Sequence, residues 1–329
     1  MFLRLTRRIL SSGATLLAVS LLTFALLRLA PGDPASISAA RNLRPGRLDS
    51  AAAERFRAEF GLDRPLSEQW VGWLRRSATF DFGTSWRTGF PVIEEIGERL
   101  PVTVGLNAAA LLVACVGGII SGVLFASRRG RALDRLGTTA TFLALALPSF
   151  ALGTAALLLL GGGRYFNVIP VQGLHSEGFE SMTLARRLAD LAWHAVTPVL
   201  VLSYSSLASF SRTVRAGMIE ALGQGYIRAA RARGLSERSI LFRHALRNSL
   251  SPLFVQLGLS LPALVSGSAI IERLFGLPGV GQLLFEAVLS RDYAVIMGVV
   301  TVTAVATMAG MLLDDLLCAL VDPRLRSRP

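Results

Sequence analysis

The sequence predicts an all-α integral membrane protein with about six membrane-spanning helices. Of its 329 residues, 52% are hydrophobic and only 17% are charged, a balance typical of polytopic membrane proteins. Each long apolar run must be helical, because lipid offers no partner to an unpaired backbone group. The expected spans, each near the ~20 residues that cross a hydrocarbon core, are residues 9–30, 102–126, 136–160, 191–211, 251–272 and 293–320.

The first span is expected to remain in the mature protein as a helix. Its apolar run is long and ends at Arg28-Leu-Ala-Pro31 without the small-residue site at which a signal peptide is cleaved. The segment that follows is expected to be a small outer insertion, with an amphipathic run near 50–60 and a helix over 67–74 that carries Trp70 and Trp73 on one side. The predicted organisation is 1–30 for the N-terminal cytoplasmic end and first helix, 31–100 for the insertion, and 101–329 for the membrane core.

The remaining spans differ in how clearly the sequence indicates them. Glu94, Glu95 and Glu98 give the second span an amphipathic entry, whereas Pro198 and neighbouring polar residues make the fourth span the weakest. Between the fifth and sixth spans, the Gly-rich segment 275–281 lacks the Lys-Ser/Thr pair of a phosphate-binding loop. It is therefore predicted to be a tight turn before a short helix.

Positive charge indicates how the chain crosses the membrane. All 34 basic residues are Arg, and the net charge is +12. The Arg residues cluster at both termini, at 128–135 and at 212–250, whereas in 31–100 they are balanced by Asp and Glu. By the positive-inside rule, both termini and residues 212–250 are expected in the cytoplasm and residues 31–100 on the outer side. Because the charge reports orientation, it gives no support to nucleic-acid binding.

No catalytic or metal-binding motif is evident in the sequence. His175, His194 and His244 fall in three different segments without metal-ligand spacing, and there is no nucleophile elbow and no Walker motif. Energy for any transport must then come from another protein or from an ion gradient. Asp314 and Asp315, near the inner end of the last span, are the only paired acids expected in the membrane. They are interpreted either as a structural pair near the inner gate or as a proton or substrate relay.

An Arg-rich elbow in the inner connection 212–250 is the main candidate site. Helix-forming residues on both sides of Gly234 predict two short helices joined by a left-handed turn. Its small Ala residues allow close approach, and its Arg side chains can bond to acidic or carbonyl groups of a soluble partner. The alternative is a basic loop that only obeys the charge rule or binds anionic lipid. The predicted docking residues are Tyr226, Arg228, Ala229, Ala230, Arg231, Gly234 and Leu235.

The elbow resembles a known coupling loop. The segment Glu220-Ala-Leu-Gly-Gln-Gly-Tyr-Ile-Arg-Ala-Ala-Arg-Ala-Arg-Gly234, followed by His244-Ala-Leu-Arg-Asn248, is similar to the cytoplasmic coupling loop of the dipeptide/oligopeptide/nickel permease family of bacterial ABC importers. Arg228 stands where the wider importer superfamily has Glu. The outer insertion resembles that of the first, long-insertion permease type. Further similar landmarks are 21–24, 31–34, 61–63, 81–85, 148–150, 276–281, 291–293 and 322–326.

The resemblance carries expectations for fold, function and partners. It implies a type I ABC importer-like bundle in the bacterial inner (plasma) membrane, without catalysis or a cofactor in this chain. It implies a second homologous permease, two cytoplasmic ATP-binding subunits and a periplasmic or lipid-anchored solute-binding protein as partners, with lipid around the spans. Di- or oligopeptides are the expected solute, and nickel chelates, glutathione and opines are alternatives within the family. The alternative outside the family is a gradient-driven secondary transporter, which would show inverted repeats and a broken helix at midplane.

Overall fold

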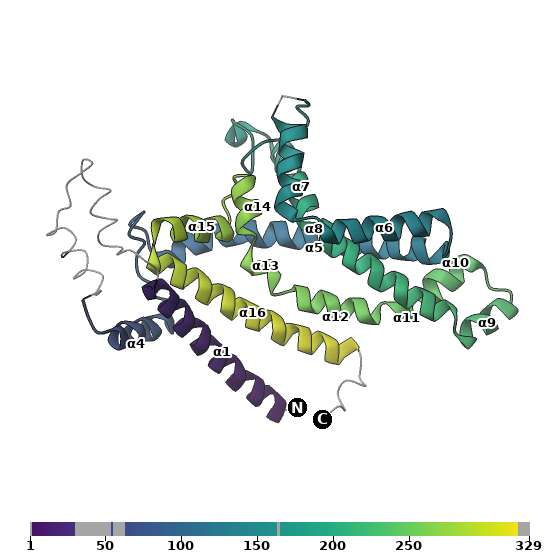
Figure 1. Ribbon diagram of the computed structural model, residues 1–329, viewed down its shortest axis with the longest axis horizontal. Coiled ribbons are helices and arrows are strands. Elements are labelled where there is room, and N and C mark those ends of the chain that lie inside the picture. The colour runs from purple at the N-terminus through teal and green to yellow at the C-terminus, as the bar shows by residue number, and fades with distance from the viewer. Residues whose placement is uncertain (1, 30–53, 55–62, 163–164, 322–329) are drawn as a thin grey trace. The chain divides into compact units, whose positions relative to one another are not determined.

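The computed structural model describes residues 2–29, 54, 63–162 and 165–321, with side chains described from residue 10 to residue 312 within these ranges. These residues are mainly helical (Figure 1). Their one β contact is an isolated antiparallel bridge between Thr84 and Pro91. The amphipathic run expected near 50–60 lies outside the described residues. The helix expected over 67–74 is present as α4 (Leu66–Ser77).

Within the described residues, four helices are long and apolar enough to cross a membrane. Two further spans are helix pairs that bend at a short break, by 99° between residues 146 and 149 and by 51° between residues 249 and 251. Counted as one span each, the pairs bring the total to six and confirm the predicted fold class. The long helices are α1 (Phe2–Leu29), α5 (Val92–Ser127), α8 (Leu184–Leu222) and α16 (Tyr293–Val321), and the first bent pair is α6 (Ala132–Ala146) with α7 (Ser149–Ala156) and its π-helical extension Leu157–Gly161.

Shorter helices fill the second half of the chain. After α8 come α9 (Gly225–Ala232), α10 (Glu237–Ser239), the π-helical turn Ile240–Ala245 and α11 (Leu246–Ser249). The second bent pair continues with α12 (Ser251–Ser260) and α13 (Ala263–Ser266), followed by α14 (Ala269–Leu274) and α15 (Val280–Ser290). A tight turn with Gly276 at φ +62° precedes α15, as the Gly-rich segment predicts.

The span expected over 136–160 is present as α6 and α7 with a break between them. Leu147 adopts an extended conformation (φ −83°, ψ 131°) directly before Pro148, because the proline ring disfavours a helical residue in front of it. The carbonyl of Leu147 is left without a helical partner, and it accepts a hydrogen bond from the hydroxyl of Tyr204 on α8. The break between α6 and α7 is therefore stabilised by a hydrogen bond from α8.

The chain divides into two compact units, Met1–Leu100 with Leu283–Ala306, and Pro101–Gln282 with Thr307–Pro329. In the second unit, α8 is the central helix and packs against α6, α7, α11, α12 and α14. It also lies very close to α5: a Cβ atom added at Gly118 would come within 2.6 Å of the Cβ of Phe210, and one at Gly122 within 2.7 Å of the carbonyl oxygen of Ser211. Small residues at such contacts let helix backbones approach in a membrane.

In the first unit, a buried aspartate joins two of the landmark segments. Asp292, fully buried between α15 and α16, accepts a hydrogen bond from the Ser85 hydroxyl at 2.7 Å and another from the backbone N–H of Val295 at 3.3 Å. Close by, Arg87 forms an ion pair with Glu286 at 3.3 Å. These contacts give a physical reason for the polar residues at 81–85 and 291–293, because they anchor one segment onto the other.

Candidate functional site

The elbow begins where α8 ends and contains the two short helices and the left-handed glycine that the sequence predicts. The chain leaves α9 through Arg233 and turns at Gly234, whose φ is +78°. The N–H of Gly234 donates to the carbonyl of Arg231 at 2.9 Å, and the N–H of Leu235 donates to that of Ala230 at 3.3 Å. This pair of hydrogen bonds is the Schellman motif, which satisfies the last carbonyls of a helix with a glycine in the left-handed region. The next helix, α10, is capped by Ser236, which precedes it and whose hydroxyl accepts a hydrogen bond from the N–H of Ser239. The expected inner connection 212–250 includes the last turns of α8, and the elbow proper starts at residue 223.

The inner face of α9 anchors the elbow to the membrane core. Ile227 and Ala230, three residues apart on one face of the helix, are both buried. They belong to one apolar cluster with Met218 of α8, Ile240 and Ala245. Ala230 was expected among the docking residues, but the structure places it on the packed side. Its small side chain allows α9 to lie close to the core.

The Arg side chains of α9 and of the turn that follows it fall into two groups. Arg231 forms a bidentate ion pair with Glu237, Nε to Oε1 at 2.7 Å and Nη2 to Oε2 at 3.3 Å, which bridges the Gly234 turn. Arg228 and Arg233 are exposed, and no ion pair of either is found among the described residues. Because Arg231 is occupied within the elbow, the other two guanidinium groups are better placed to meet a partner.

The remaining predicted docking residues lie at the surface. The Tyr226 hydroxyl accepts a hydrogen bond from the Asn248 side chain at 2.9 Å, which ties α9 to the chain at α11. Ala229 is exposed, and Leu235 is 38% exposed just beyond the turn. Phe242, 55% exposed in the π-helical turn, was missed by the sequence interpretation. Its only sequence signal is a bulky aromatic residue inside a cationic segment, and it adds apolar surface to the elbow.

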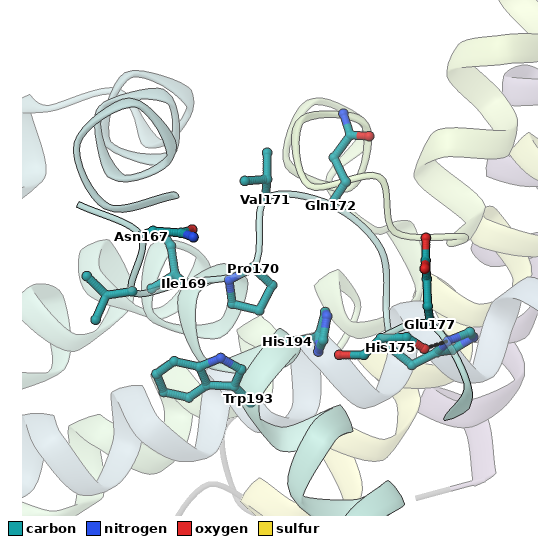
Figure 2. A pocket seen from close by; sticks show the side chains of 11 residues that line it. Asn167, Ile169, Pro170, Val171, Gln172, His175, Glu177, Trp193 and His194 are labelled. Carbon is teal, nitrogen blue, oxygen red and sulfur yellow. Dashed lines mark hydrogen bonds between the residues drawn. The ribbon is translucent and has the colours of Figure 1, made fainter. Parts of the chain in front are cut away.

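A second candidate site is a pocket of about 500 Å³ at the other end of α8 (Figure 2). Trp193 and His194 of α8 line it together with the segment 167–177, which includes His175 and Glu177. The structure thus brings together two histidines that the sequence interpretation kept apart. The ring of His194 lies against Asp190, one helical turn earlier, with Nδ1 at 2.9 Å from the backbone carbonyl oxygen of Asp190. The carboxylate of Asp190 in turn accepts a hydrogen bond from the Ser176 hydroxyl at 2.6 Å. In the part of the chain that the structure describes, no group of three metal-ligating side chains is present. The lining of the pocket offers polar side chains, such as those of His175, Glu177 and His194, that can contact a solute.

Two acidic residues, Glu272 and Asp134, are buried in contacts that the sequence did not indicate. Asp314 and Asp315 lie in α16, but their side chains are outside the described residues. Glu272 was expected simply to end the fifth span. It is instead buried in α14, where its carboxylate accepts the Thr103 hydroxyl at 3.1 Å and the N–H of Gln282 at 2.9 Å. Asp134 is buried in an ion pair with Arg215, with an Nε to Oδ1 distance of 2.6 Å. The contacts of Glu272 with Thr103 and of Asp134 with Arg215 join residues 169 and 81 positions apart in the sequence.

Comparison with known proteins identifies the family. Residues 118–327 match the family described as "Binding-protein-dependent transport system inner membrane component", and residues 1–107 match its N-terminal region. The chain is 35% identical over 320 residues to the oligopeptide transport system permease protein AppB of Bacillus subtilis, covering 97% of this chain and 98% of the relative. It is 36% identical to the dipeptide transport system permease protein DppB of Lactococcus lactis, over 95% of each chain. It is 33% identical to the dipeptide transport system permease protein DppB of Escherichia coli, over 95% of this chain and 96% of the relative. The protein is therefore a multi-pass membrane protein that belongs to the family of binding-protein-dependent transport system inner membrane components, as the resemblance of its motifs predicts.

Proposed function

We propose that this chain is a non-catalytic translocation subunit of an ATP-driven importer of short peptides, and that its elbow receives the motion of a separate ATPase. The observation that carries the coupling role is the construction of the elbow. One face of α9 is anchored in the membrane core through Ile227 and Ala230, while Arg228 and Arg233 remain exposed. The cationic surface of α9 is packed onto α8, so a displacement imposed on it by a soluble protein would be transmitted to the membrane spans.

The substrate class follows from the relatives. Proteins that match nearly the whole chain are named for oligopeptide and dipeptide transport. Nickel chelates, glutathione and opines are the competing solutes. The polar pocket at Trp193, His194 and Glu177 supports a contact with a solute that carries amide and charged groups, as a short peptide does.

The proposed assembly contains four further components. A second homologous permease completes the path, two ATP-binding subunits bind the elbows, and a periplasmic or lipid-anchored solute-binding protein delivers the solute. In this arrangement residues 1–30 contribute the N-terminal cytoplasmic end and first span, 31–100 an outer insertion, and 101–329 the core, with both termini in the cytoplasm of a bacterial cell. The concentration of Arg in the inner segments supports this orientation.

A gradient-driven carrier is the alternative from another class. The broken spans at residues 146–149 and 249–251 are a feature that such carriers also use. The family match and the constructed elbow favour the ATP-driven importer, because a carrier that works alone needs no docking surface for an ATPase.

Uptake by the reconstituted complex tests the proposal. Proteoliposomes that hold both permeases, with ATP-binding subunits and ATP inside, are given the solute-binding protein and a labelled dipeptide or tripeptide outside. Import is expected to require ATP and the binding protein and to be reduced by excess unlabelled peptide. Competition by nickel chelate, glutathione or opine instead of peptide would reassign the solute. Peptide uptake by this chain alone, driven by a pH gradient, would refute the ATP-driven assignment.

A further inference from the structure

α6 and α8 are antiparallel neighbours joined at three successive levels. The carboxylate of Asp134, near the start of α6, accepts two hydrogen bonds from the guanidinium of Arg215, at 2.6 Å from Nε and 2.9 Å from Nη2. Farther along, the guanidinium of Arg212 lies over the ring of Phe142, 4.1 Å from its centroid. At the end of α6, the Tyr204 hydroxyl bonds to the carbonyl of Leu147. The pairing order shows that the two helices are connected along the length of α6.

The ion pair is the strongest of the three connections. The Asp134 side chain is only 4% exposed, and its Oδ2 also accepts the backbone N–H of Gly130 at 2.9 Å. Removing the partner of a buried charge leaves that charge uncompensated, so a change that separates α6 from α8 is opposed as long as the pair is intact. Bidentate Arg–carboxylate geometry also fixes the relative orientation of the two helices.

The same end of α8 carries the elbow. Gly217, two residues beyond Arg215, lies against α11: a Cβ atom there would come within 3.0 Å of the Cβ and carbonyl oxygen of Ser249. One residue later, Met218 packs in the same buried cluster as Ile227 of α9. Arg215 therefore stands between the anchor of the elbow and the start of α6.

We infer that Asp134 and Arg215 are positioning residues that pass displacement of the elbow to α6. Because the span breaks at Leu147 and Pro148, α6 can move with the elbow end of α8, and the bend absorbs this movement before it reaches α7, which packs against α14 and another part of α8. This inference rests on the proposed function, since it assumes that the elbow receives the motion of an ATPase. It assigns a coupling role to two residues of the ion pair between α6 and α8.

The test measures how many ATP molecules are hydrolysed per solute imported, using the complete importer in proteoliposomes. The variants are Asp134→Asn, Arg215→Gln and the double variant. Arg135→Gln, which removes an exposed Arg next to Asp134, is the matched control. Both single variants are expected to hydrolyse ATP while import falls by about tenfold, within the range of typical coupling between sites. The double variant is expected to be no worse than either single variant, because both changes break the same contact. Arg135→Gln should import like the wild type.

Each other outcome has a defined meaning. An unchanged ratio of ATP hydrolysed to solute imported, whether both activities persist or both fall together, overturns the inference and leaves the pair a purely structural role. If Asp134→Asn yields no assembled complex, Arg215→Lys replaces it, since Lys keeps the charge but loses the bidentate geometry. A raised ratio in Arg215→Lys supports the inference and an unchanged ratio overturns it. Wild-type vesicles without ATP-dependent import would refute the proposed function itself, which is a different result.

Discussion

Gly234 holds a backbone conformation that few other residues tolerate. Its φ of +78° lies in the left-handed region, and it closes the hydrogen-bonded end of α9. A Cβ atom added there would meet no atom within 4 Å among the described residues. The penalty for a side chain at this position therefore comes from the backbone alone and does not involve steric overlap.

Replacing Gly234 by Val is expected to cost about 1–2 kcal/mol in the left-handed turn and to displace α10 from its place. The variant should insert into the membrane normally and lose both import and stimulation of ATP hydrolysis, measured in proteoliposomes. Gly234→Asn is the control, because Asn tolerates the left-handed region and should keep most of the activity. Normal transport by Gly234→Val would show that the elbow is not the point of transmission.

The two groups of Arg side chains in α9 and its turn are expected to respond differently to substitution. Arg228→Gln should weaken binding of the ATP-binding subunits by about 1.5–3 kcal/mol, the range for hydrogen bonds to charged groups. Arg231→Gln should weaken it less, because Arg231 is already bonded to Glu237 and this exposed pair adds little to stability. The dissociation constant of the detergent-solubilised permease pair for the ATP-binding subunits measures both effects. An equal or larger loss for Arg231→Gln contradicts this assignment.

At the scale of elements, the contact between α5 and α8 depends on the absence of side chains on α5. Gly118 and Gly122, four residues apart, share one face of the helix and leave room for the backbone of α8 near Ser211. The hydroxyl of Ser121 adds a hydrogen bond to that of Ser211 at 2.8 Å. Close approach of this kind maximises van der Waals contact where the hydrophobic effect cannot drive helices together.

Gly122→Leu is expected to destabilise the protein by at least about 1–3 kcal/mol, the usual cost of overpacking. A Cβ atom there would lie 2.7 Å from both the carbonyl oxygen of Ser211 and the Cβ of Val214, so the helices would have to separate. Thermal unfolding in detergent measures the change. Gly105→Leu, on the same helix in open space, is the matched control and should unfold near the wild-type temperature. Equal stability of both variants would show that the contact is loose.

At the scale of the whole molecule, orientation is the property that the distribution of Arg predicts. On a background without Cys115 and Cys318, a single Cys at position 50 should react with a membrane-impermeant maleimide added outside. A Cys at position 232, on the exposed part of the elbow, should react only after the inner face is opened. The opposite labelling pattern would reverse the orientation.

The energy source is also a property of the whole assembly, and Asp314 and Asp315 provide the test. In an ATP-driven importer these acids need not release a proton, so Asp314→Asn and Asp315→Asn should import solute in the complete complex with a collapsed proton gradient and internal ATP. In a proton-coupled carrier one of them would bind the driving proton. Uptake by this chain alone that depends on a pH gradient and is abolished by either substitution would contradict the ATP-driven mechanism.

The spans and the elbow could be predicted from the sequence because their signals are local. An apolar run of sufficient length has no stable alternative to a helix in lipid, and Gly234 between two helix-forming segments marks its own turn. The ordered motifs likewise indicated the family, permease subunits of ABC importers, which the comparisons confirm. These features depend on residues that are neighbours in the chain.

Only the tertiary structure decided which residues meet across the chain. The ion pair between Asp134 and Arg215 joins residues 81 positions apart, and Arg215 looks in the sequence like any other Arg of an inner loop. Ala229 and Ala230 are identical in type, yet the first is exposed and the second is buried, because Ala230 lies with Ile227 on the face of α9 that packs against the core. The bend of 99° after Leu147 likewise requires a partner for the freed carbonyl, and Tyr204 of a distant helix supplies it. Ion pairs and burial depend on contacts between helices that are distant in the sequence, so they are determined only when the helices pack together.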